Sequence, residues 1–119
     1  MIRFSSLLTI PILIILAACT GSTPETASPE LNAFAQCLTQ KGAIFYGTEW
    51  CQFCQQQKNL FLDAIQYITF VDCDKNRLAC STAGIQSYPT RVINGTNAAG
   101  VQSLEFLASQ SGCPLPSVN

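Results

Sequence analysis

The first eighteen positions carry one nearly unbroken apolar run, unlike any later segment. A single basic residue, Arg3, precedes this run, which extends from Phe4 to Ala18. A basic start, an apolar stretch of about 7–15 residues and small residues at its end are typical of a secretory signal. The run is shorter than the roughly 20 residues that span a bilayer comfortably. A cleaved signal is therefore favoured over the alternative, an uncleaved membrane anchor.

Beyond this segment the apolar positions follow helical and strand periods in turn. Ser28, Pro29 and Glu30 supply a helix cap, a proline for the first helical position and an acid for the first turn. Short apolar or β-branched runs predict buried strands. The expected elements are a helix from Ser28 to Gly42, a strand at 43–46, a helix at 51–66, a strand at 68–71, a short helix at 75–83, strands at 90–93 and up to about 101, and a helix from Ser103 to Gly112.

The order of these elements predicts an α/β fold. Helices and strands alternate first, which favours parallel pairing, and Asn94-Gly95 is a strong signal for a two-residue hairpin near the end. We therefore expect a central mixed sheet of about four strands flanked by helices. Residues 29–119 suit one small domain with one core.

Residues 19–28 connect the apolar run to this domain. Thr20 to Ser28 is small and polar, which predicts a flexible tether with a reach of roughly 15–20 Å. Leu16-Ala17-Ala18-Cys19 resembles the lipobox of bacterial lipoproteins. That resemblance implies removal of residues 1–18 as a signal peptide, lipidation of Cys19, and anchoring of an exported chain to a membrane of the cell envelope, on its periplasmic or outer face.

Charge and residue types exclude several function classes. Counted from Cys19, five basic side chains stand against seven acidic ones, a net charge of −2, with no basic patch for nucleic acid. The chain has no histidine, so the usual general base and the commonest metal ligand are missing. We interpret Asp72 and Asp74 as solvated turn acids. No cofactor is expected.

Six cysteines remain once Cys19 is set aside. An even number in an exported chain indicates disulfides. Zinc is the competing use of the closely spaced pair Cys51 and Cys54, but a zinc knuckle needs a second close pair. Cys73 and Cys80 are too far apart in sequence for that, so no metal site is expected.

The segment Trp50-Cys51-Gln52-Phe53-Cys54 lies where a strand passes into a helix. Two intervening residues place both thiols on one side of the first helical turn. Cys51 is at the open amino end, where unpaired N–H groups and the helix dipole favour its thiolate. Cys54, one turn further, is placed to resolve a mixed disulfide. The spacing predicts thiol–disulfide exchange, with a static disulfide as the alternative.

Three segments resemble the thioredoxin family in order and spacing. They are Glu49 to Cys54, Gly84 to Thr90, and Asn94-Gly95 with the closing helix. The resemblance covers about residues 31–113 and implies a thioredoxin-like fold.

The same resemblance implies which residues meet the substrate. It predicts a cis peptide bond at Tyr88–Pro89, facing the cysteine pair, where an extended substrate segment pairs beside Cys51. Trp50, Tyr88 and Pro89 are thus the expected substrate-binding residues.

A closer resemblance is to the thioredoxin-like domain that accompanies bacterial homologues of vitamin K epoxide reductase. It implies that the domain introduces disulfides into exported proteins and is reoxidised by a membrane-embedded reductase, here a separate chain. That family often has Pro-His between the cysteines, where this chain has Gln52-Phe53. The resemblance rests on Cys37-Leu38, Lys41-Gly42, Phe45-Tyr46-Gly47, Trp50 with Cys51 and Cys54, Cys73 with Cys80, Ile85-Gln86, Tyr88-Pro89-Thr90 and Gly100 to Glu105.

The expected protein is therefore a monomeric, membrane-tethered thiol–disulfide oxidoreductase that forms or isomerises disulfides in exported cysteine-containing proteins. One alternative is an extracytoplasmic disulfide reductase. A redox potential of the cysteine pair of about −120 mV would mark a strong oxidant, and one of about −270 mV would mark a reductant. The other alternative is a non-catalytic binding module with structural disulfides, which insulin reduction or refolding activity would distinguish.

The remaining four cysteines are expected to form structural disulfides. Cys73 and Cys80 lie at the two ends of a short connection, so a bridge between them closes a small loop. Cys37, near the end of the first helix, and Cys113, just past the last, are then left to pair. The alternative is that Cys37 and Cys113 stay unpaired.

Overall fold

The computed structural model describes residues 25–117. The expected signal peptide and Cys19 lie outside the described residues. Among residues 25–117, no helix has the length and apolar character needed to cross a membrane.

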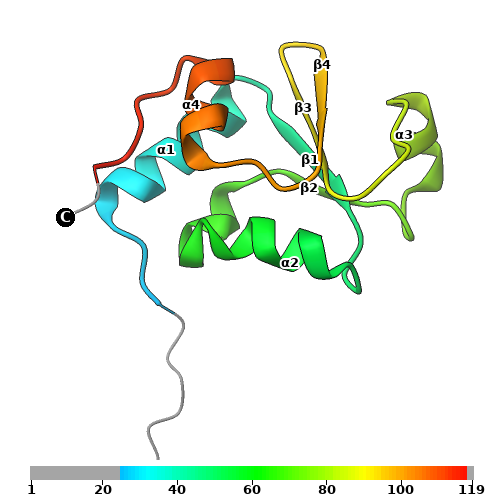
Figure 1. The fold of residues 1–119 in the computed structure, drawn as a ribbon, viewed down its shortest axis with the longest axis horizontal. Helices are drawn as coiled ribbons and strands as arrows, with labels where there is room; N and C mark the ends of the chain where they lie inside the picture. Colours follow the sequence, from blue (N-terminus) through cyan, green and yellow to red (C-terminus); the bar gives the residue numbers. More distant parts are fainter. Residues whose placement is uncertain (1–24, 118–119) are drawn as a thin grey trace, which may run out of the picture.

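A four-stranded mixed sheet forms the centre of the domain (Figure 1). Its strand order is β2-β1-β3-β4, with β1 and β2 parallel and the other neighbours antiparallel. The mixed α/β architecture expected from the sequence is confirmed and is compatible with a thioredoxin-like fold. The elements are α1 (Pro29–Gln40), β1 (Ile44–Gly47), α2 (Gln52–Asn59), the 3₁₀ helix η1 (Leu62–Tyr67), β2 (Phe70–Asp72), α3 (Arg77–Thr82), β3 (Thr90–Ile93), β4 (Thr96–Ala99) and α4 (Leu104–Ser111).

The side chains of β1 alternate between the two faces of the sheet, as the period of a strand requires. Phe45 points to the face covered by α2 and packs edge-on against Phe61, with ring centroids 5.8 Å apart. Tyr46 points to the other face and packs with Cys73 and Cys80. Gly47, at the carboxyl end of β1, returns to the α2 face.

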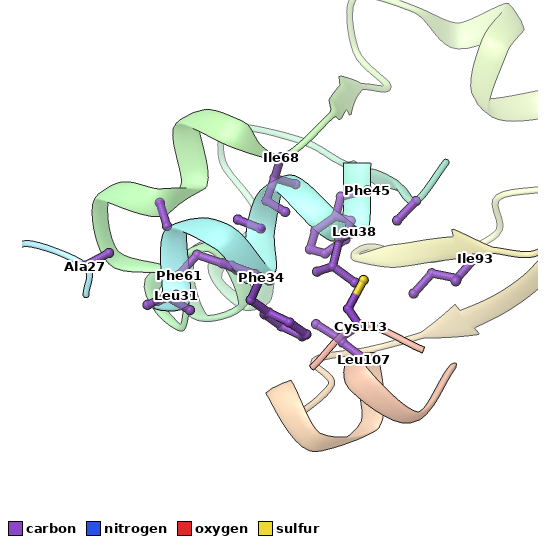
Figure 2. Close-up of a cluster of buried hydrophobic side chains, with 13 residues drawn as sticks. Ala27, Leu31, Phe34, Leu38, Phe45, Phe61, Ile68, Ile93, Leu107 and Cys113 are labelled. Atoms are coloured by element: carbon purple, nitrogen blue, oxygen red, sulfur yellow. The ribbon is translucent and has the colours of Figure 1, made fainter. Parts of the chain in front are cut away.

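The main core lies between α1, α4, η1 and the sheet. Figure 2 shows Phe34 and Leu38 of α1 gathered with Leu107 of α4 and with Phe45 and Ile93 of the strands. These side chains are buried, and the amphipathic faces of α1 and α4 therefore meet at one end of the sheet, while α3 lies at the other end (Figure 1).

The helix expected over residues 51–66 is divided in the structure. α2 ends at Asn59, and η1 begins at Leu62, whose φ of 51° is left-handed. The amide of Ala64 donates to the carbonyl of Phe61 at 2.9 Å, a bond three residues back. This tighter winding buries both Phe61 and Ala64. Expecting one continuous helix here was wrong because apolar spacing alone does not separate it from two shorter pieces.

The described end of the expected tether packs on the domain. Ala27 is buried, and its amide donates to Asp63 Oδ1 at 2.7 Å. Ser28 Oγ accepts the amide of Leu31 at 3.1 Å and caps α1, as expected. At Ala27, therefore, the segment is not a free tether, because its small apolar side chain packs into the core and its amide reaches the carboxylate of Asp63.

Within residues 25–117 the structure has two disulfides, and they are the two pairings expected from the sequence. Cys37 of α1 is bonded to Cys113 beyond α4, with an S–S distance of 2.07 Å. Cys73, after β2, is bonded to Cys80 of α3 at 2.05 Å. The first joins the two chain-end helices, and the second fixes α3 to the end of β2.

Candidate active site

Cys51 and Cys54 are free thiols at the start of α2. Cys51 is the N-cap residue of this helix, and its Sγ accepts the backbone amide of Cys54 at 3.2 Å. Only 6% of Cys51 and 1% of Cys54 is exposed. The more exposed of the two cysteines thus lies at the amino end of the helix, where backbone N–H groups favour a negative charge. Cys54 lies behind it, one turn deeper.

Burial raises the pKa of the Cys54 thiol to about 11. Loss of solvation is the largest cause, and the hydrogen bond with Cys51 acts in the same direction. A hydrogen bond from the backbone of Thr48 and the charge of Lys58 partly oppose this rise in pKa. At neutral pH Cys54 keeps its proton, so Cys51 is the better placed nucleophile.

Gly47 leaves the space that Cys54 occupies. A Cβ atom at Gly47 would lie 2.6 Å from Cys54 Sγ and 3.3 Å from Cε2 of Phe70. Any side chain here would displace the sulfur or the strand. Gly47 was not among the residues predicted for the site, although a glycine at the end of a buried strand, just before the cysteine pair, is a signal for such a close approach.

Lys58 places a positive charge beside Cys54. Its Nζ lies 3.9 Å from the ring centroid of Phe70 and 3.5 Å from Glu49 Oε2. Lys58 follows Cys54 by four residues on α2, so the two side chains share one face of the helix. Sequence reasoning missed Lys58, whose spacing from Cys54 was the available signal.

Trp50 is 72% exposed and yet held by two contacts. Its Nε1 donates to Asp74 Oδ2 at 2.7 Å. Its ring packs edge-on against the ring of Tyr88, with the two ring centroids 6.4 Å apart. Interpreting Asp74 as a solvated turn acid was therefore incomplete, since it fixes an aromatic ring next to Cys51. Phe53, 59% exposed, lies on the first turn of α2.

The peptide bond between Tyr88 and Pro89 is cis, immediately before β3. Pro89 is buried, and its carbonyl accepts the amide of Gly100 at 2.8 Å. Through the contact of Tyr88 with Trp50, the structure brings the proline segment to the loop that carries Cys51. Trp50 contacts Tyr88, and Pro89 follows Tyr88 in the chain, so the three residues expected to bind substrate lie together.

The site has the chemistry of a thiol pair. Residues 25–117 contain no cluster of three or more metal-ligating side chains. One sulfur at the amino end of a helix and a second, protonated sulfur one turn further along it can form and release a disulfide.

The chain resembles a protein of known function. No protein-family model matches the chain. The chain is 33% identical over 104 residues to the thiol-disulfide oxidoreductase LTO1 of Arabidopsis thaliana, a match that covers 80% of this chain and 28% of that protein. The chain therefore spans less than a third of the length of this relative.

Proposed function

We propose that the chain is a thiol–disulfide oxidoreductase in which Cys51 and Cys54 are the redox pair. The observation that carries this proposal is the asymmetry of the two thiols. Cys51 caps the amino end of α2, whereas Cys54 is buried behind it with a pKa raised to about 11. Such a pair provides one sulfur for attack by a partner and a second for resolution.

In the oxidative direction, a substrate thiolate attacks Sγ of Cys51 in the Cys51–Cys54 disulfide. The bond between the two protein sulfurs breaks, and Cys54 leaves with the electron pair and takes up a proton. A second substrate thiolate then attacks the substrate sulfur of the mixed disulfide, and Cys51 leaves as a thiolate. The substrate dithiol is oxidised by two electrons, and the cysteine pair is reduced by two.

Trp50, Tyr88 and Pro89 form the substrate contact surface in this proposal. An exposed ring that is already held by Asp74 loses little conformational freedom when a substrate covers it. We propose that a cysteine-containing segment of an exported protein lies against Trp50 and Tyr88, with its sulfur over Cys51.

The location and the electron acceptor are proposed from the sequence. The chain is exported, anchored by lipid at Cys19, and reoxidised by a membrane reductase of the vitamin K epoxide reductase type. Replacing Cys19 with Ala should leave an uncleaved precursor without lipid label in a labelling experiment. Unchanged processing and labelling would refute the anchor and leave the redox proposal standing.

Activity on purified protein tests the proposal. Oxidative refolding of a reduced substrate and reduction of insulin should both require Cys51, and Gln56→Ala, at an exposed position on the same helix, should keep the wild-type rates. The redox potential then separates a disulfide-forming protein from a reductase. Absence of both activities in the folded wild-type protein would favour a non-catalytic binding module.

A further inference from the structure

A buried polar network joins α2 to the segment that follows β4. Gln57 of α2 is 1% exposed, and its side-chain amide forms two hydrogen bonds with the backbone of Gln102. Nε2 of Gln57 donates to the carbonyl of Gln102 at 3.2 Å, and Oε1 accepts the amide of Gln102 at 2.8 Å. Since both backbone groups of Gln102 are bound by one side chain, the position of residues 100–102 against α2 is fixed.

Arg91 of β3 connects this pair to the end of β4. Its side chain is 0% exposed, and Nη1 donates to Oε1 of Gln57. Nη2 donates to the carbonyls of Ala98 at 3.1 Å and Gly100 at 2.8 Å. Because the guanidinium is planar and its donors point in fixed directions, one side chain holds α2 and the end of β4 in a defined relative position.

Gly100 extends the network to the proposed substrate surface. Its carbonyl accepts from Arg91, and its amide donates to the carbonyl of Pro89 at 2.8 Å. Pro89 follows Tyr88, whose ring packs against that of Trp50. A continuous series of hydrogen bonds thus runs from the helix that carries the cysteines to the residues proposed to contact substrate.

Packing alone does not account for these polar side chains in the core. Burial lowers the pKa of Arg91 to about 10, so the guanidinium is charged at neutral pH, and its Nε is buried without a hydrogen-bond partner among the described residues. A buried charge is costly, and apolar side chains of similar volume at such positions are often no less stable. The network supplies what an apolar core does not, a defined relative position of two elements, because each hydrogen bond has a direction.

We propose that Gln57 and Arg91 are positioning residues that hold the cysteine helix against the Tyr88–Pro89 segment. A polypeptide bound to that segment then presents its sulfur to Cys51 in a reactive geometry. This inference rests on the proposed function, in which the substrate chain lies against that segment. Both side chains act through the backbone of residues 100–102 and not on the sulfurs. Reaction with a polypeptide therefore depends on the network, whereas reaction with a small dithiol, which has no chain to place, does not.

The test compares a polypeptide with a small dithiol as electron donors to the oxidised protein. In either reaction the donor dithiol becomes a disulfide, and the Cys51–Cys54 disulfide becomes two thiols. The measured quantity is the second-order rate constant for a reduced peptide with two cysteines, divided by that for dithiothreitol. Because a misplacement of about 1 Å can slow a bound reaction about 10²-fold, we expect Arg91→Met and Gln57→Met each to lower this ratio by at least about tenfold.

Two further variants serve as controls. Gln56→Met makes the same chemical change as Gln57→Met at an exposed position of the same helix, and it should change the ratio by less than about twofold. Combining Arg91→Met with Gln57→Met should lower the ratio little further than either substitution alone, because each one breaks the same connection.

The outcomes separate this inference from the proposed function. If either folded variant, Arg91→Met or Gln57→Met, keeps the wild-type ratio, or if both rate constants fall by the same factor, the role of the network is structural and the inference is overturned. Losses that multiply in the double variant would show that the two side chains act separately, which also overturns it. Circular dichroism and the mass of the two intact structural disulfides establish that each variant is folded. If the oxidised wild-type protein does not oxidise the peptide, the proposed function itself fails.

Discussion

A single methyl group at Gly47 tests the geometry of the cysteine pair. The Cβ of Gly47→Ala would lie 2.6 Å from Cys54 Sγ, 3.5 Å from Cys54 Cβ and 3.3 Å from Cε2 of Phe70. The first distance is far inside van der Waals contact, so the sulfur or the strand must move. Overpacking of this kind costs about 1–3 kcal/mol of unfolding free energy. Because the severe contact is with the sulfur, removing the sulfur should remove most of that cost.

A double-mutant cycle measures this relief. All four proteins carry Cys51→Ala, so that Cys54 stays a free thiol while the two structural disulfides remain oxidised. Urea unfolding then compares Gly47→Ala, Cys54→Ala and the combination with the common background. We expect a coupling energy of about 1–2 kcal/mol, because the added methyl group also fills the cavity left by the sulfur. A coupling below about 0.5 kcal/mol would show that Gly47 does not limit the position of Cys54.

Three further predictions follow from the site and the disulfides. The thiolate absorbance of Cys54 at 240 nm, taken as reduced wild type minus Cys54→Ala, should have its midpoint near pH 11. Since the folded pKa lies above the ordinary value of 9.0, stability from this group should be complete below about pH 9 and lost as the pH rises through 11; a midpoint at 9 would contradict the burial argument. Asp74→Ala should lower the fluorescence anisotropy of Trp50, the sole tryptophan, and Asp74→Asn should largely retain it; equal values in all three proteins would exclude the hydrogen bond. Serine pairs should cost about 4–5 kcal/mol in place of Cys37–Cys113, which closes a 76-residue separation, and about 2–3 kcal/mol in place of Cys73–Cys80, whose separation is 7; the reverse order in urea unfolding would contradict loop-closure entropy as the cause.

Local signals predicted the ends of several elements well. Ser28 and Pro29 start α1, and Ser103 caps α4, because their side chains or fixed backbone angles satisfy the first helical turn by themselves. Gly112 ends α4 with a φ of 76°, where glycine meets no steric penalty. The hairpin at Asn94-Gly95 is likewise encoded in two residues.

Features that depend on distant contacts were not predictable from local sequence. The break after α2 depends on how Phe61 packs against Phe45, a contact between segments that lie apart in the chain. Asp74 becomes a partner of Trp50 only because the fold joins positions separated by 24 residues. The spacing of Cys51 and Cys54 was visible in the sequence, but Gly47 of β1 and Phe70 of β2, whose packing fixes the place of Cys54, lie in other parts of the chain.

The central claim is that Cys51 forms the mixed disulfide with a partner and that Cys54 is the sulfur that leaves when it forms and attacks it in the reverse direction. The most direct measurement is the mass of adducts formed with a reduced, unfolded substrate protein under mild oxidation. Cys54→Ser should accumulate a mixed disulfide in which every substrate bond maps to Cys51, and Cys51→Ser should accumulate none. Adducts of equal yield in the two variants, or continued turnover in both, would contradict the assignment of the redox pair.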